Sequence, residues 1–323
     1  MARILVTGGS GFIGTNLVEH YRLRGDHIVN LDIAPPRNPE HVGLWRRIDL
    51  LDRAALIRAV ADADPETVFH MAARTDLNGK SIHDYPANTE GVANLSQALR
   101  GVRVLRLVVF ASSMLVCRIG YQPRNEFDYS PNTAYGESKI AGEQLVREEA
   151  AGTLPWVMVR PTSIWGPWFG APYRDFFTAV QRGFYVHPRG YRIRRSYGFV
   201  LNNVAQLAQL ATAGGGPLLG RTVYLADYVP IELKHWADTI QRALGVRPVR
   251  EVPLWVLQMA ARVGDMLKAL GYATPPMSSF RLKNLLTEMI LDTSPLRSAC
   301  GDMPYSTEEG VRITCDWLRR DTP

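Results

Sequence analysis

The sequence predicts an α/β protein built on a doubly wound parallel sheet, with a smaller, mostly helical lobe toward the carboxyl end. Three observations carry this prediction. Short apolar runs alternate with helical segments over the first half of the chain. A glycine-rich turn joins the first run to the first helix, and an acidic residue closes the second run. Repeated strand–helix units of this length are typical of a parallel sheet covered on both faces.

The chain begins with a strand-like run and a glycine-rich turn, ARILVTGGSGFIG over residues 2–14. Such an apolar, β-branched run is typical of a buried parallel strand, and a helix is expected to start near Phe12. Gly8 permits the tight turn, and Gly11, which has no Cβ, leaves room for a pyrophosphate at the helix amides. Gly14 lets the helix pack closely on the strand. Taken alone, a glycine triplet is also compatible with a purely structural turn.

The segment after the first helix supports a nucleotide site. Residues 27–31 form a second apolar run, which ends at Asp32, 18 residues beyond Gly14. A dinucleotide site places an acid here to accept hydrogen bonds from the adenosine ribose hydroxyls. The same carboxylate would repel a 2′-phosphate, so the pattern predicts NAD as the cofactor in preference to NADP.

Composition limits the other possibilities. The chain has 323 residues, 46% of them hydrophobic and 21% charged, which is ordinary for one large domain or two unequal ones. The net charge of +6 suits an anionic ligand, but no basic run of the kind that binds nucleic acid is present. The three cysteines form no CxxC pair, and the first apolar stretch is a strand rather than a signal peptide. We therefore expect a cytoplasmic protein with no metal site and no nucleic-acid partner.

One later stretch, Val252–Leu270, is strongly apolar. Four polar residues interrupt it and exclude a membrane span: Gln258, Arg262, Asp265 and Lys268. The spacing predicts an amphipathic helix. Core packing and binding to a membrane surface both fit such a helix, and core packing is the expected role, with no membrane partner.

Further strand-like runs bring small and polar residues to one edge of the sheet. A run over 45–50 contains Asp49, and a run over 67–70 leads into Ala72 and Ala73, whose small side chains allow a cofactor to lie close. His70, at the end of the second of these runs, is interpreted as a core histidine with its hydrogen bonds satisfied. Helices are expected over 52–61 and 84–100.

The fifth strand-like run, over 104–111, delivers Ser112 and Ser113 at its carboxyl end, where ligands of open parallel sheets bind. A helix after residues 131–133 carries Tyr135 and Lys139, which are four residues apart and share a helix face. A lysine ammonium near a phenol is expected to lower the phenol pKa. Tyr135 is therefore a candidate acid and base for an alcohol–ketone pair, and Ser113 a candidate donor to the substrate oxygen.

Together, these motifs resemble the extended short-chain dehydrogenase/reductase family, and within it the NAD-dependent nucleotide-sugar epimerases and dehydratases. The resemblance rests on TGGSGFIG, Asp32, HMAA, ASSMLV, YGESK and RPTSIWGP in this order, and on the tail SPLRSACGDMPYSTEEGVRITCDWLR. It implies a Rossmann NAD-binding domain over 1–165 and about 199–228, and a substrate lobe over about 166–198 and 229–323. It also implies a homodimer formed through the helices near 84–100 and 132–150.

The resemblance implies contacts to the cofactor from Gly8, Gly11, Phe12, Ile13, Gly14, Asp32, Asp49, Leu50, Ala72, Ala73, Tyr135, Lys139, Arg160 and Thr162. It implies a catalytic set of Ser113, Tyr135 and Lys139. It assigns substrate binding to Thr75, Ser113, Ser163, Arg195 and Arg281. Arg195, in the segment RSYGFV, is expected to meet a substrate diphosphate, because a guanidinium binds phosphate oxygens in pairs.

Five positions depart from the patterns of this group. Met114 and Leu115 stand where dehydratases have an Asp-Glu pair and decarboxylases a glutamate, so neither chemistry is expected. Cys117 replaces a tyrosine and is most simply a small packing residue. Ser163 stands where many 4-epimerases have an asparagine that binds the sugar nucleotide. Asn203 replaces a frequent aspartate, and the sequence offers no reason for that change.

The predicted function is epimerisation of a nucleotide-diphosphate sugar, by transient oxidation to a keto-sugar and reduction on the other face with NAD retained. Three alternatives remain open. The first is a nucleotide-sugar 4-keto-reductase or dehydrogenase, which would stop after one hydride transfer. The second is a hydroxysteroid-type or flavonol-type dehydrogenase with an apolar substrate. The third is a non-catalytic NAD-binding protein.

Overall fold

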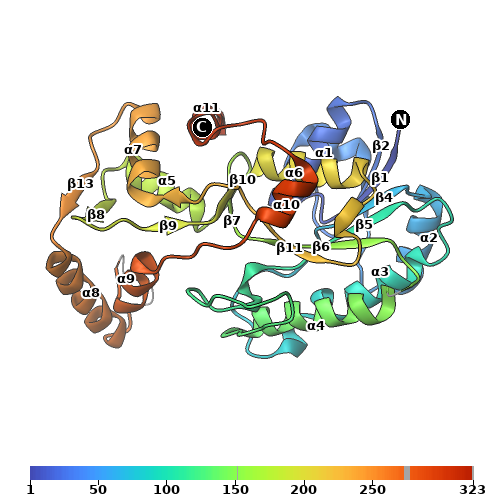
Figure 1. The fold of residues 1–323 in the computed structure, drawn as a ribbon, viewed down its shortest axis with the longest axis horizontal. Coiled ribbons are helices and arrows are strands. Elements are labelled where there is room, and N and C mark those ends of the chain that lie inside the picture. The colour runs from blue at the N-terminus through green and yellow to red at the C-terminus, as the bar shows by residue number, and fades with distance from the viewer. Residues whose placement is uncertain (151, 273–276, 322–323) are drawn as a thin grey trace.

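The computed structural model describes residues 1–150, 152–272 and 277–321, which form two unequal lobes (Figure 1). The larger lobe contains a seven-stranded parallel sheet with the order β11-β6-β5-β4-β1-β2-β3. The strands are β1 (Arg3–Thr7), β2 (His27–Asp32), β3 (Trp45–Arg47), β4 (Thr67–His70), β5 (Leu107–Ala111), β6 (Trp156–Pro161) and β11 (Thr222–Leu225). The predicted doubly wound parallel sheet is confirmed.

Helices cover both faces of this sheet (Figure 1). One face carries α1 (Phe12–Leu23), α6 (Val200–Thr212) and α10 (Ser294–Cys300), and the other carries α2 (Arg53–Ala63), α3 (Glu90–Leu99) and α4 (Ala134–Ala150). Successive strand residues point to opposite faces, so Leu5 packs with the second group while Ile4 and Val6 pack with the first. This two-sided burial explains why the strands read as continuous apolar runs.

The strand order reverses between β1 and β4, because the chain leaves β1 for β2 on one side and later returns to β4 on the other. In open parallel sheets, ligands bind at the carboxyl ends of the strands beside such a reversal. The glycine-rich turn follows β1 at this point. The last strand, β11, pairs with β6 only after the chain has passed through the second lobe, with Val223 opposite Val159.

Two predicted elements differ in extent. The expected helix over 84–100 is instead the two 3-10 turns η2 (Ile82–Asp84) and η3 (Pro86–Asn88), followed by α3. The side chain of Asn88 accepts from the Arg74 amide and donates to the Arg74 carbonyl, so it ties the second turn to the loop after β4. The third strand follows the 3-10 helix η1 (Pro39–Leu44) and is shorter than expected, because it ends at Arg47, opposite Asp32, the last residue of its partner β2.

The second lobe surrounds an aromatic core of Trp165, Phe177, Phe199 and Trp236. Its helices include α5 (Tyr173–Gln181), α7 (Leu233–Leu244) and α11 (Thr307–Asp321). Three small sheets pair β7 (Ser163–Trp165) with β10 (Tyr197–Phe199), β8 (Val186–Pro188) with β13 (Arg250–Val252), and β9 (Arg194–Arg195) with β12 (Ile231–Glu232). Although α10 follows this lobe's elements in sequence, it packs on the larger lobe through Leu296.

The stretch predicted to pack in the core, Val252–Leu270, forms the helix α8 (Leu254–Ala269). It packs against α9 (Ser279–Leu286), and the two helices form a hairpin at the tip of the second lobe, at the lower left of Figure 1. The helix is amphipathic as expected, but only Leu257, Ala261 and Gly264 of α8 are buried. The prediction of core packing is wrong for the opposite face of α8, whose apolar side chains are exposed. Within the described residues, no helix is both long enough and apolar enough to cross a membrane.

Candidate active site

The glycine-rich turn has a shape that requires glycine. Gly8 has a φ of +73°, and a Cβ on it would lie 2.5 Å from the amide nitrogen of Ala72. A Cβ on Gly14 would collide with the carbonyl oxygen of Gly8, so the close approach of α1 to β1 depends on glycine there. Gly11 is the N-cap of α1, and because it is a glycine no side chain caps the first helix amides. Those amides can therefore serve an anionic ligand.

Asp32 is fixed beside this turn at the end of β2. Its two carboxylate oxygens accept hydrogen bonds from the amides of Ser10 and Ala34, each at 3.0 Å. The Arg37 Nε donates to the Ser10 carbonyl at 3.2 Å, which braces the turn from the other side. The carboxylate is thus held where the sequence predicts contact with an adenosine ribose.

A hollow of about 430 Å³ opens next to Asp32, at the carboxyl ends of β2 and β3. Its lining contains two isoleucines and several charged side chains: Ile33, Arg47, Ile48, Asp49, Asp52 and Ala55. Apolar walls with a polar rim suit a flat heteroaromatic ring. Asp49, predicted to flank the adenine, lines this hollow. The side chain of Leu50, also predicted to flank this ring, packs instead in the core between the sheet and α3.

His70 is a core histidine, as predicted. Its Nδ1 lies 2.7 Å from the Thr7 Oγ1, and the ring is almost completely buried. Burial, reinforced by the charge of Lys139, lowers the pKa of His70 to about 3, so the ring is neutral near pH 7. Ala72 and Ala73 follow it at the sheet edge and are half-buried, and Thr75 lies beyond them on an exposed part of the loop.

The structure brings the three predicted catalytic residues together. Ser113 follows β5 and caps the 3-10 helix η4 (Met114–Val116), accepting from the Leu115 amide at 3.1 Å. Tyr135 and Lys139 lie in the first turns of α4, on the same face. All three are buried, and the Tyr135 and Ser113 hydroxyls are hydrogen-bonded to each other.

The acid–base properties differ from the expectation that Lys139 lowers the phenol pKa. Burial raises the pKa of Tyr135 to about 12, and the hydrogen bond from Ser113 opposes that rise only in part. The Lys139 Nζ donates to the Ala111 carbonyl at 2.9 Å. Burial lowers the pKa of Lys139 to about 8, although the Glu143 carboxylate opposes this. In this structure Tyr135 is therefore a protonated phenol near pH 7.

A buried ion-pair network lies directly behind this set. Glu143 is one turn beyond Lys139 on α4 and is fully buried. The Ser112 hydroxyl donates to its Oε1 at 2.6 Å, and Arg160 donates from Nε to Oε1 and from Nη2 to Oε2, both at 2.8 Å. Burial raises the pKa of Glu143, but hydrogen bonds from Arg160 and Ser112 outweigh it, and the net effect lowers that pKa. Glu143 is therefore ionised and paired.

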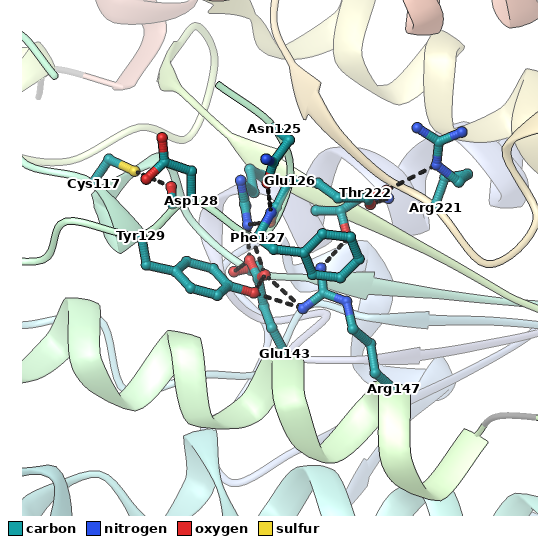
Figure 2. Close-up of polar contacts among 12 residues, drawn as sticks. Cys117, Asn125, Glu126, Phe127, Asp128, Tyr129, Glu143, Arg147, Arg221 and Thr222 are labelled. Carbon is teal, nitrogen blue, oxygen red and sulfur yellow. Dashed lines mark hydrogen bonds and ion pairs between the residues drawn. The ribbon is translucent and has the colours of Figure 1, made fainter. Parts of the chain in front are cut away.

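Figure 2 shows Tyr129 reaching Glu143 from the 117–130 loop and Arg147 reaching it from the next turn of α4. The Tyr129 hydroxyl donates to Glu143 Oε2 at 2.9 Å, and the Arg147 Nη1 donates to the same oxygen at 3.2 Å. Arg147 also donates to the Thr222 hydroxyl at 2.7 Å, so the network reaches β11. One carboxylate thus connects α4, β6, the residue before Ser113, and the edge strand of the sheet.

This network alters the predicted role of Arg160. The resemblance assigned Arg160 to the cofactor, but its guanidinium is buried and donates to the Glu143 carboxylate and the Glu126 carbonyl. The side chain therefore belongs to the network. Glu143 was not predicted from the sequence. Its position four residues after Lys139, on the same helix face, was a signal that could have indicated it.

Two of the predicted substrate residues, Ser163 and Arg195, lie in small strands of the second lobe. Ser163 starts β7 and is hydrogen-bonded to the Tyr173 hydroxyl, and the rings of Tyr173 and Tyr197 are in edge contact. Arg195 donates from Nη2 to the Asn284 carbonyl. Its Nε is buried and has no hydrogen-bond partner among the described residues. The predicted diphosphate contact is thus partly committed to an internal bond.

Four further predicted positions are placed less distinctively. Thr162 is buried, and its amide donates to the Leu225 carbonyl of β11 at 3.1 Å. Phe12 and Ile13 are half-buried in the first turn of α1. Arg281 is exposed on α9, one turn before Asn284. Among the described residues, no cluster of three or more histidine, cysteine or acidic side chains is placed to hold a metal ion.

Two departures from the group patterns now have a structural setting. Cys117 is buried, its Sγ donates to the Asp128 carbonyl, and burial raises the thiol pKa, which agrees with the predicted packing role. Asn203 donates to the Gln206 Oε1 at 2.8 Å beneath Gly198. Nothing in this contact explains why an asparagine replaces the frequent aspartate.

The fold and the site together define a class: a nicotinamide-dependent enzyme of the extended short-chain dehydrogenase/reductase type, which oxidises or reduces a carbon bearing oxygen. The comparisons agree. The model of the NAD-dependent epimerase/dehydratase family matches residues 4–185. The chain belongs to this family, and its cofactor is NAD.

Relatives within the family differ in substrate. A 3-beta-hydroxysteroid dehydrogenase of Mycolicibacterium neoaurum is 30% identical over 76% of this chain and 71% of its own length. A 2-alkyl-3-oxoalkanoate reductase of Stenotrophomonas maltophilia is 26% identical over 96% of this chain and 97% of its own. The structure of a Thermus thermophilus UDP-glucose 4-epimerase with NAD superposes with a TM-score of 0.71 at 24% identity, over 99% of this chain and all of that one. The last likeness establishes the fold.

Proposed function

We propose that the protein is an NAD-dependent dehydrogenase or reductase that interconverts a secondary alcohol and a ketone on a mainly apolar substrate. The observation that carries the chemistry is the meeting of Ser113, Tyr135 and Lys139 beside the glycine turn. In favour of an apolar substrate, Arg195, the predicted diphosphate ligand, already donates from Nη2 to the Asn284 carbonyl. The printed activities of the two curated relatives, on a hydroxysteroid and an alkyl-oxoalkanoate, point the same way.

The cofactor fits the residues present. The cradle formed by Gly8, Gly11 and Gly14 leaves no room for a Cβ at two of its three positions, and the open amides of α1 suit a pyrophosphate. Asp32 would hold the adenosine ribose, and the hollow between β2 and β3 would hold the adenine. When bound, NAD supplies or accepts the hydride.

The chain's own residues then manage the proton. The Ser113 hydroxyl, whose oxygen accepts from the Leu115 amide, would redirect its proton from the Tyr135 oxygen to the substrate oxygen and so orient it. Tyr135, protonated near pH 7, gives its phenol proton to the ketone oxygen as hydride arrives at carbon. In the oxidative direction the phenol must lose its proton first, and the hydrogen bond from Ser113 favours the phenolate.

A nucleotide-sugar epimerase is the second candidate, because arginines gather at the substrate lobe around β9, with Arg192 exposed there. One assay separates the two. The protein is incubated with NAD and either 3-hydroxysteroids and long-chain 3-hydroxy acids, or UDP-, GDP-, CDP- and dTDP-sugars. The proposal predicts NADH formation with the apolar alcohols. Sugar interconversion without net NADH would establish the epimerase and overturn the proposal.

A further inference from the structure

The outer face of α8 is the most apolar exposed surface that the structure describes. The spacing of Trp255, Met259 and Val263, continued by Met266 and Leu270, places these side chains on one side of the helix. Their exposed fractions run from 49% at Val263 to 76% at Leu270. Contiguous apolar surface of this kind on a globular protein marks an interaction site.

This face is not part of the substrate lobe's core. The buried side of α8, formed by Leu257 and Ala261, packs against Leu282 of α9. Within the described ranges, nothing packs on the opposite side, and Tyr272 and Phe280 are exposed as well. The helix is therefore apolar on two sides, and within the described chain only one of them is covered by other residues.

The rim of the hairpin is cationic. Between residues 254 and 286 the sequence has four cationic side chains, Arg262, Lys268, Arg281 and Lys283, and one acid. That acid, Asp265, accepts a hydrogen bond from the Ser279 amide and so joins the two helices. No ion pair engages Arg262 or Lys283 within the parts of the chain that the structure describes, and both are exposed. An apolar face with a positive rim complements a surface that is apolar inside and negative outside.

We propose that the α8–α9 hairpin docks on an anionic lipid surface, with the outer face of α8 at the acyl boundary and the cations at the phosphates. Trp255 suits this position, because its amphipathic ring favours the boundary between headgroups and acyl chains. A second copy of the chain fits less well, because two such faces would bring two positive rims together. The hairpin is tied to the substrate lobe where Arg195 donates to the Asn284 carbonyl of α9, so docking would bring this lobe to the membrane.

Flotation of the full chain with vesicles tests the inference. Vesicles of phosphatidylcholine mixed with phosphatidylglycerol are expected to carry the protein upward, and phosphatidylcholine alone to carry much less. The double variant Met259→Glu/Val263→Glu is expected to abolish flotation. The matched control, Leu23→Glu/Val42→Glu, places the same charges on exposed apolar residues of another surface and is expected to float like the wild type. Replacing Arg262 or Lys283 by glutamine should weaken vesicle partitioning about fivefold each.

Folding and self-association are checked on the same samples. Thermal midpoints and NADH binding should match the wild type in every variant, because none of these residues lies in the glycine turn or the catalytic set. Failure of the wild type to float, or equal flotation of the α8 double variant, would overturn the inference. So would light scattering showing an oligomer that the α8 variant dissolves while no vesicles bind, since that result assigns the face to a second copy.

Discussion

The hydroxyl of Ser112 donates to the carboxylate of Glu143 at 2.6 Å. This bond joins the residue next to Ser113 to the helix that carries Tyr135 and Lys139. A buried contact outside the site thus sets the distance between Ser113, which orients the substrate, and Tyr135, which moves the proton. Arg160 and Arg147 keep the carboxylate charged, so the joint is rigid as well as specific.

Glu143→Gln should damage both stability and turnover. Breaking one partner of a buried ion pair costs about 3–5 kcal/mol, because Arg160 is left charged and uncompensated. We expect a large fall in the urea midpoint and a lower kcat, with the KM for NAD less affected. The matched control is Glu149→Gln on the same helix, where the exposed pair with Arg100 should be worth at most about 1 kcal/mol. Equal effects of the two changes would remove Glu143 from its positioning role.

Tyr135→Phe should lower turnover by roughly two to four powers of ten, since the proton donor is lost and the ring is kept. NADH affinity, measured by fluorescence, should stay unchanged. Tyr121→Phe serves as the control, because that hydroxyl bonds to Asp128 away from the catalytic set. Near-normal turnover in Tyr135→Phe would show that another group moves the proton.

Gly8→Ala should weaken NADH binding by about tenfold or more, equal to about 1.4 kcal/mol. The added methyl group would press on the Ala72 amide at the floor of the turn. Gly25→Ala is a close control, because Gly25 has a φ of +75°, like the +73° of Gly8, but open space around its Cβ position. Both variants place an alanine at a positive φ, so the backbone strain is matched between them. Isothermal titration should therefore show weakened binding only in Gly8→Ala, where the methyl group also meets Ala72.

Asp32→Ala should reduce the preference for NAD over NADP. Removing the carboxylate ends its repulsion of a 2′-phosphate and leaves Arg47 in the neighbouring hollow. Dissociation constants for both reduced cofactors give the ratio, with Asp62→Ala on α2 as the control for loss of one surface acid. An unchanged ratio would mean that Asp32 does not contact the ribose.

Asp227 gives a prediction for pH. Burial raises the pKa of this acid to about 7, and hydrogen bonds from Asn202 and the Phe199 amide offset the rise only in part. Between its ordinary pKa and about 7 the folded state binds more protons than the unfolded state. The contribution of Asp227 is therefore complete in acid and lost as pH rises toward 7, by an amount of the order of 4 kcal/mol.

The isosteric variant Asp227→Asn should remove that slope. Urea unfolding at pH 5 and at pH 8 measures the effect, and the wild type should lose more stability than Asp227→Asn between these two values. A parallel pH dependence in the two proteins would show that Asp227 stays ionised across this range.

Local sequence patterns were sufficient for the sheet and for much of the site. The glycine spacing, Asp32 at a strand end, and the i, i+4 pair of Tyr135 and Lys139 are all short-range signals, and the structure places each as expected in the fold. Contacts between segments that are far apart in the sequence could not be predicted from such patterns. Arg195 and Asn284 are 89 residues apart, so no local pattern could reveal that the Arg195 guanidinium donates to the Asn284 carbonyl.

Burial posed a second difficulty. The sequence shows that α8 has an apolar stripe, but periodicity does not say which side another element covers, and core packing was the wrong expectation for its outer side. The pKa of Tyr135 is a related case. A nearby lysine lowers a phenol pKa, but the desolvation that raises it depends on everything packed around the ring, which the sequence does not specify.

The late return of β11 to the sheet has a consequence for biosynthesis. While residues 162–221 are being translated, β6 remains an open parallel edge of a nascent chain, with its backbone groups unpaired. At roughly 5–20 residues per second this interval lasts seconds, long enough for a ribosome-bound intermediate to meet chaperones or neighbouring chains. A fragment ending near residue 165 would keep that edge permanently, so the amino-terminal half should aggregate when expressed without the segment that contains β11.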